Sequence, residues 1–185
     1  AGSFVLSGLA QSVITVHLVP ALTDKGISPE KAAFSLGFMV LISIVGRLSF
    51  GWLGDFIKKR YLFTVCYCMQ AAAIFLLIIA QDMNLVYIFI VVYGVGFGGG
   101  IPLDPAIRVE YFGRAAFAKI GGFMAPMYTI SGITGPLLAG YLFDITGTYH
   151  LIFAIMAILQ IVGAVVILFA RPQKNQNEQK IINAS

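Results

Sequence analysis

The sequence predicts an all-α membrane protein with six transmembrane helices. Of its 185 residues, 59% are hydrophobic and 11% are charged, whereas a soluble domain of this size carries about a quarter charged residues. The apolar residues form six runs, each close to the ~20 residues that cross the hydrocarbon core of a bilayer. The cations gather at the ends of these runs, as expected where a helix leaves the membrane.

We expect spans at about residues 4–22, 29–54, 61–80, 85–103, 117–143 and 149–170. The second begins at Ser28-Pro29, because serine is a favoured N-cap and proline suits the first helical position. Glycines and prolines gather in the fourth and fifth spans, which predicts close helix packing or a bend. Residues 1–171 are expected to form one transmembrane domain. The polar residues 172–185 are expected to be a disordered cytoplasmic tail.

The loop cations predict the orientation of the bundle. When the loops are assigned alternately, two cations (Lys25 and Lys31) lie on one side, and nine lie on the other: Lys58, Lys59, Arg60, Arg108, Arg114, Lys119, Arg171, Lys174 and Lys180. Because loops rich in Lys and Arg stay inside, the C-terminus is expected in the cytoplasm. We expect a multi-pass protein of the plasma (inner) membrane.

Several function classes are disfavoured. The net charge of +4 does not indicate nucleic-acid binding, because the cations do not line one polar face. Cys66 and Cys68 point to different sides of a helix, and His17 and His150 are the two histidines, so we expect neither a metal site nor a cofactor. The sequence offers no nucleophile paired with a base, so we expect no enzyme. It begins in an apolar run without a signal peptide, which indicates a chain cut at the start of a helix.

The second span contains a charged residue, Arg47. Such a charge costs about 2.5–3.5 kcal/mol at the bilayer centre, so the guanidinium is expected to face a water-filled cavity. Its planar fork suits a carboxylate. A structural pair with a protein group outside this chain and snorkelling to the membrane surface are the alternatives.

Other polar and aromatic side chains complete the predicted substrate-binding set. His17 either faces the cavity or is hydrogen-bonded within the bundle. Tyr93 and Tyr128 are placed in the cavity wall, with aromatic packing as the alternative. Gln70 and Gln160 lie mid-span, where interhelical hydrogen bonding is expected.

A short motif follows Arg47, namely Gly51-x-Leu53-x-Asp55-x-x-Lys58-Lys59-Arg60. We expect Gly51, Asp55, Lys58, Lys59 and Arg60 to form a gating latch in which Asp55 caps a neighbouring helix. Gly51 is expected at a close approach of two helices. An ordinary solvated loop is the alternative. Farther along, Asp104 and Arg108 are spaced for a local ion pair at a helix end.

The motif resembles the loop signature Gly-x-Leu-x-Asp-Arg-x-Gly-Arg-Lys of the major facilitator superfamily, in its copy between helices eight and nine. Two positions depart from it, because Phe56 stands for the usual arginine and Lys58 for the usual glycine. Further matches are similar to the monocarboxylate and oxalate/formate antiporter branch: Thr23-Asp24-x-Gly26-Ile27-Ser28, Tyr111-Phe112-Gly113-Arg114 and Gly135-Pro136-x-x-Ala139-Gly140-x-x-Phe143-Asp144.

The resemblance implies two inverted three-helix repeats that form the C-terminal half of a secondary active transporter. It also implies alternating access to a small organic anion, with monocarboxylates favoured, in a cavity shared with an N-terminal six-helix half. In that branch an arginine followed by Ser-x-Gly binds the carboxylate, and Arg47-Leu48-Ser49-Phe50-Gly51 matches that pattern. Ser43 stands where some members carry an aspartate for proton coupling. The alternatives are an exporter of drug-like or amphipathic solutes and a six-helix oligomeric channel.

Overall fold

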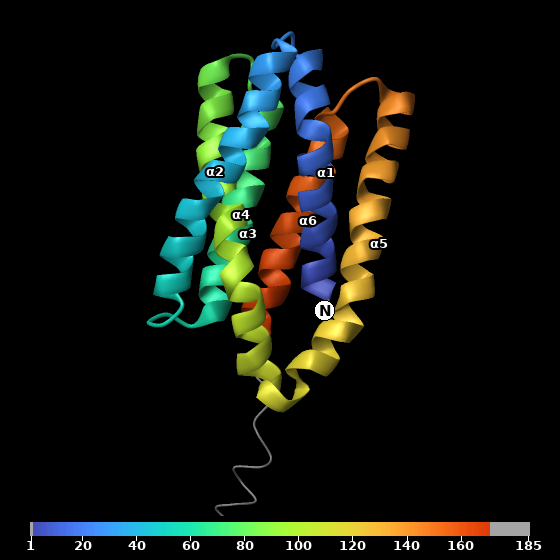
Figure 1. Ribbon diagram of the computed structural model, residues 1–185. Coiled ribbons are helices and arrows are strands. Elements are labelled where there is room, and N and C mark those ends of the chain that lie inside the picture. The colour runs from blue at the N-terminus through green and yellow to red at the C-terminus, as the bar shows by residue number, and fades with distance from the viewer. Residues whose placement is uncertain (1, 171–185) are drawn as a thin grey trace, which may run out of the picture.

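The computed structural model describes residues 2–170 and confirms the predicted fold class. These residues form six α-helices and no strand (Figure 1). The helices are α1 (Gly2–Asp24), α2 (Pro29–Leu53), α3 (Lys59–Ile79), α4 (Met83–Phe112), α5 (Arg114–Thr146) and α6 (His150–Phe169). Five are long and apolar enough to cross a membrane. The sixth, α5, is long enough, but its Gly, Pro, Ser and Thr residues lower its hydropathy. The predicted tail lies outside the described residues.

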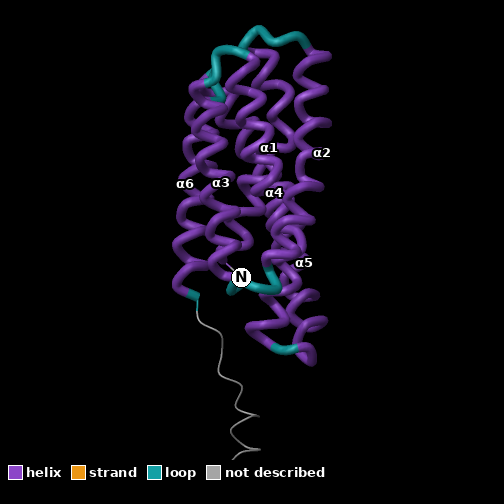
Figure 2. The backbone as a smooth tube through the Cα atoms, turned by 90° about the vertical axis from the view of Figure 1, so that its left-hand side faces the viewer, coloured by secondary structure: helices purple, strands orange, loops and turns teal. Residues whose placement is uncertain are grey.

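The helices form a bundle with α1 and α4 in the middle. Helices α3 and α6 cover one side of this central pair, and α2 and α5 lie on the other (Figures 1 and 2). Helix α4 packs mainly against α2 and α3, whereas α1 packs mainly against α5 and α6. We call the end with the α2–α3 and α4–α5 connections the basic end, because Lys58, Lys59, Arg60 and Arg114 lie there.

Glycines allow the backbones of α2 and α4 to touch. A Cβ atom on Gly46 would collide with the backbone of Val95, and one on Gly98 would collide with the backbone of Ser43. The glycines of α4 therefore serve close packing, as predicted. By contrast, a Cβ on Gly51 would meet Pro102 at an ordinary 3.9 Å. The tightest contacts thus involve Ser43 and Gly46, which precede Gly51 on α2.

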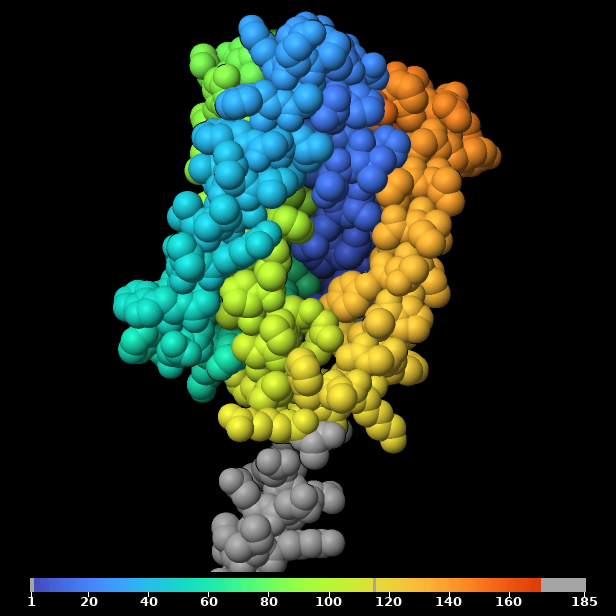
Figure 3. All heavy atoms as spheres, viewed as in Figure 1, coloured from blue at the N-terminus to red at the C-terminus, as the bar shows by residue number. Residues whose placement is uncertain are grey.

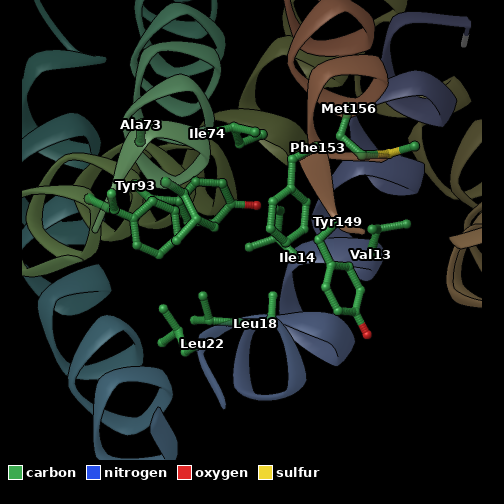
Figure 4. Packing of buried hydrophobic residues seen from close by; sticks show 14 of the residues in the cluster. Val13, Ile14, Leu18, Leu22, Ala73, Ile74, Tyr93, Tyr149, Phe153 and Met156 are labelled. Atoms are coloured by element: carbon green, nitrogen blue, oxygen red, sulfur yellow. The ribbon is translucent and has the colours of Figure 1, made fainter. Parts of the chain in front are cut away.

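A large apolar cluster fills the half of the bundle away from the basic end (Figure 4). It joins residues of all six helices, including Ile14, Leu18, Ile74, Tyr93 and Phe153. All five are fully buried. This cluster fixes the helices around a second, more polar region nearer the basic end.

Helix α4 continues beyond Leu103, where the fourth span was expected to end. Its last residue is Phe112, and the segment predicted as a connector is helical despite Pro102 and Pro105. Asp104 therefore lies about 12 Å of helix rise before the end of α4. This aspartate was expected at a helix end. The structure corrects that expectation and places it inside the bundle.

Candidate functional site

A polar cavity of ≈ 200 Å³ lies between α1, α3, α4 and α5. Its mouth coincides with a hollow between α1, α4 and α5 in the space-filling view (Figure 3). The lining residues are Phe4, Ser7, Gly8, Gln11, Phe63, Tyr67, Phe97, Gly100, Ile101, Asp104 and Tyr128. Asp104 is the one charged residue among them. Hydroxyl and amide groups supply the other polar atoms, so the cavity combines one carboxylate with neutral hydrogen-bonding groups.

Asp104 is held by a cation and a phenol at the cavity wall. The Arg108 guanidinium donates from Nε to Oδ1 at 2.9 Å and from Nη2 to Oδ2, so the pair is two-pronged. This confirms the predicted ion pair. Tyr128 of α5 donates its hydroxyl to Oδ2 at 3.3 Å and accepts from Arg108 at 3.1 Å. The cluster therefore joins α4 to α5, two helices that otherwise touch little.

The two residues of the pair face different surroundings. The Arg108 side chain is 12% exposed and the Asp104 side chain 25%. The guanidinium lies over the rings of Phe4 and Tyr128 and lines a neighbouring apolar pocket with Phe4 and Tyr111. The Asp104 carboxylate thus lines the polar cavity, and the Arg108 guanidinium lines the neighbouring apolar pocket.

A chain of glutamines runs from the cavity into the bundle. Gln11, in the cavity wall, donates to the side-chain oxygen of Gln70 at 3.2 Å, and Gln160 donates to the same oxygen at 2.9 Å. The Gln70 amide donates in turn to the Gly96 carbonyl. The interhelical hydrogen bonding predicted for Gln70 and Gln160 is confirmed. These hydrogen bonds join α1, α3 and α6 to α4. Without them, the side-chain amides would lack partners in an apolar interior.

Arg47 lies outside this cavity but at the same depth. Ser43 packs against Gly98, and Gly51 faces Pro102, so Arg47 is level with the part of α4 that lines the cavity. Its side chain is exposed and donates to the Ser43 hydroxyl at 3.5 Å. Within residues 2–170 the ion pairs join other residues, and Arg47 contacts no carboxylate.

The other predicted substrate residues lie apart from one another. His17 bonds to the hydroxyl of Tyr149 at 3.3 Å and to the Pro136 carbonyl at 3.1 Å, which fastens α1 to α5 and α6. Tyr93 is fully buried between Phe89 and Phe97. Of the set, Tyr128 lines the polar cavity. No contact among the described residues brings the four together.

The residues of the predicted gating motif gather at the basic end. Lys59 pairs with Glu110 at 3.2 Å and thereby ties the start of α3 to the end of α4. Arg60 lies over the ring of Tyr61 and donates to its hydroxyl. Asp55 is exposed, and no helix within the described residues receives its carboxylate as a cap.

Sequence reasoning overlooked the cavity as a unit. It treated Asp104 and Arg108 as a local pair, and it gave Ser7 no role. A signal for Asp104 was available, because a carboxylate four residues before an arginine matches a helical i,i+4 pair. No comparable signal linked that pair to Gln11 or Tyr128 of other helices.

Comparison with known proteins is consistent with this architecture. The family model of the Major Facilitator Superfamily matches residues 1–184. Human monocarboxylate transporter 12 is 29% identical over 175 residues, which cover 92% of this chain and 34% of that protein. Rat monocarboxylate transporter 13 is 29% identical over 155 residues, which cover 83% and 36%.

Rat monocarboxylate transporter 2 is 26% identical over 157 residues, which cover 83% of this chain and 32% of that protein. The chain thus spans about a third of the length of these relatives. The family match and the apolar helices agree, and the relatives that the chain resembles are monocarboxylate transporters. The chain belongs to the major facilitator superfamily of membrane transporters.

Proposed function

We propose that this chain is the C-terminal half of a secondary active transporter that moves a small organic anion, with monocarboxylates favoured, by alternating access. The observation that carries the proposal is the exposed guanidinium of Arg47, which has no carboxylate partner within residues 2–170. The relatives are named monocarboxylate transporters, which supports an anionic substrate.

The position of Arg47 favours substrate binding over snorkelling. About 9 Å of helix rise separates it from Leu53, the last residue of α2, and a cation that far inside a span is costly. A substrate carboxylate would compensate the charge with two parallel hydrogen bonds. The counterpart of the cavity wall would be an N-terminal six-helix half, and the basic end would face the cytoplasm of the plasma membrane.

The test is Arg47→Lys in the full-length transporter in proteoliposomes, with exchange of ¹⁴C-pyruvate as the readout. Lysine keeps the charge but loses the fork, so we expect exchange to fall at least about tenfold, equivalent to ~1.4 kcal/mol. Arg114→Lys is the matched control, because Arg114 is exposed at the start of α5, and it should exchange normally.

Normal exchange by Arg47→Lys would contradict the anion-binding role. An exporter of amphipathic solutes would instead show little effect of Arg47 substitutions and no competition by carboxylates. A six-helix channel would give a solute flux that rises with solute concentration without saturating. The same vesicles distinguish these outcomes.

A further inference from the structure

We propose that the apolar pocket at the basic end of the bundle binds a long-chain fatty acid, whose carboxylate lies on Arg108 and whose acyl chain lies against α5 and α6. This pocket of ≈ 490 Å³ is bounded by α1, α4, α5 and α6 and lies beside the polar cavity. Arg47 takes no part in it, so the assignment holds whichever solute the transporter carries.

The lining of the pocket suits an acyl chain. Its walls are mostly apolar and include Ile107, Ile120, Met124, Val166 and Ile167. Two hydroxyl groups are also present, but Ser3 donates to the Gly163 carbonyl and Tyr111 donates to the Ala170 carbonyl. The volume falls within the range of about 300–1,000 Å³ that is typical of small-molecule sites. Burial of a hydrocarbon chain would therefore be favourable there.

Arg108 supplies the one charge in the lining, and it has a free nitrogen. Its Nε and Nη2 atoms donate to Asp104, and Nη2 also donates to Tyr128. Among the hydrogen bonds of the described residues, none uses Nη1. Because the guanidinium is planar, Nη1 lies on the side away from the Asp104 carboxylate.

A glycine leaves room beside this nitrogen. Gly121 of α5 faces Arg108, and a Cβ atom built on it would lie 3.9 Å from Nη1. A guanidinium can bind one carboxylate along one edge and a second at its remaining N–H donors. The head of a fatty acid would then be separated from Asp104 by the guanidinium itself.

The pocket is open toward the membrane near its surface. Phe123 on α5 and Val166 on α6 line the pocket and are also exposed on the outside of the bundle. Arg108 lies about 6 Å of helix rise before Phe112, the last residue of α4, and beyond the expected end of the fourth span at Leu103. An amphiphile with one acidic head and one chain matches this combination of depth, charge and apolar wall. A phospholipid would bring two chains and a larger head to a pocket with one cation.

Photo-crosslinking in phosphatidylcholine nanodiscs tests the assignment on the full-length transporter. The probe is palmitate with a diazirine in its chain, and mass spectrometry locates the adducts. We expect adducts on the segments that contain Phe123 and Val166. Excess palmitate should suppress them, whereas methyl palmitate, which has the same chain without the charge, should not.

Two valines on α6 provide a matched pair of variants. Val166 and Val165 are 47% and 49% exposed, but of the two Val166 lines the pocket. Val166→Trp should lower the labelling at least about fivefold, because the indole occupies the space of the acyl chain. Val165→Trp should label within about twofold of wild type, because an exposed position outside the pocket tolerates substitution.

The double variant Asp104→Asn with Arg108→Gln tests recognition of the head. Both charges are removed together, so neither is left unpaired in the bundle. We expect palmitate labelling to fall about tenfold, because the charge-assisted hydrogen bonds are lost. Palmitate and methyl palmitate should then compete equally.

Each contrary result overturns the assignment. Equal competition by methyl palmitate in the wild-type protein would mean that Arg108 does not bind the head. Equal competition by dioleoylphosphatidylglycerol would make the ligand a phospholipid, and equal labelling of Val166→Trp and Val165→Trp would place the chain elsewhere. If wild-type protein is not labelled but a variant without residues 173–185 is, the occupant is the C-terminal segment. Because the readout is binding, these outcomes are independent of the pyruvate exchange that tests the proposed function.

Discussion

Gly37 and Gly46 lie on the same helix and differ in what faces them. A Cβ on Gly37 would have nothing within 4 Å, whereas one on Gly46 would collide with the carbonyl of Val95. A backbone atom cannot rotate away as a side-chain end can, so α2 and α4 would have to separate. The same substitution should therefore have opposite effects at the two positions.

We predict that Gly46→Ala lowers the free energy of unfolding by about 1–3 kcal/mol, the usual cost of overpacking. Gly37→Ala should raise it by up to about 1 kcal/mol, because alanine is the better helix former. Thermal melting of the purified protein in detergent measures both. Equal melting temperatures for the two variants would show that the contact at Gly46 is looser than described.

At the scale of the helix, a lysine in the α1–α2 connection caps the C-terminal end of α3. Lys25 donates from Nζ to the carbonyl oxygens of Leu77, Ile78 and Ala80 at 2.7, 3.0 and 2.7 Å. The last carbonyls of a helix lack partners within it and carry partial negative charge. One ammonium group thus satisfies the end of α3 and joins it to the first connection of the chain.

We predict that Lys25→Met, which keeps the apolar stem, destabilises the protein by about 1–2 kcal/mol. The control is Lys31→Met, which removes an exposed lysine from the first turn of α2 and should change stability by less than about 0.5 kcal/mol. Melting in detergent is again the measurement. Matching losses from both variants would mean that Lys25 acts through general charge and not as a cap.

At the scale of the whole molecule, the orientation can be tested directly. Single cysteines at Ser28 and Lys58, in a background where Cys66 and Cys68 are alanine, place probes at opposite ends of the bundle. Both native positions are exposed. A maleimide that does not cross membranes should label Ser28→Cys in intact cells and Lys58→Cys after permeabilisation. The reverse pattern would invert the topology drawn from the loop charges.

The fold class followed from the sequence because span length and loop charge are properties of short segments. The rotation of each helix about its own axis did not follow from the sequence. Exposed side chains such as Leu48, Phe34 and Phe169 are as apolar as the core, so the apolar pattern does not mark the inward face of a span. The polar cavity combines side chains from four helices. Gln11, Asp104 and Tyr128 lie far apart in the sequence, and no sequence pattern predicts that they line the same cavity.

The backbone contact between α2 and α4 has a consequence for how these two helices can move. No side chains lie between Gly46 and Val95, or between Gly98 and Ser43, that could change rotamer and let one helix slide past the other. The parts of α2 and α4 on either side of this contact should therefore move together as one rigid unit. Any rearrangement of the bundle would have to occur at its other helix contacts, where side chains and not backbones meet.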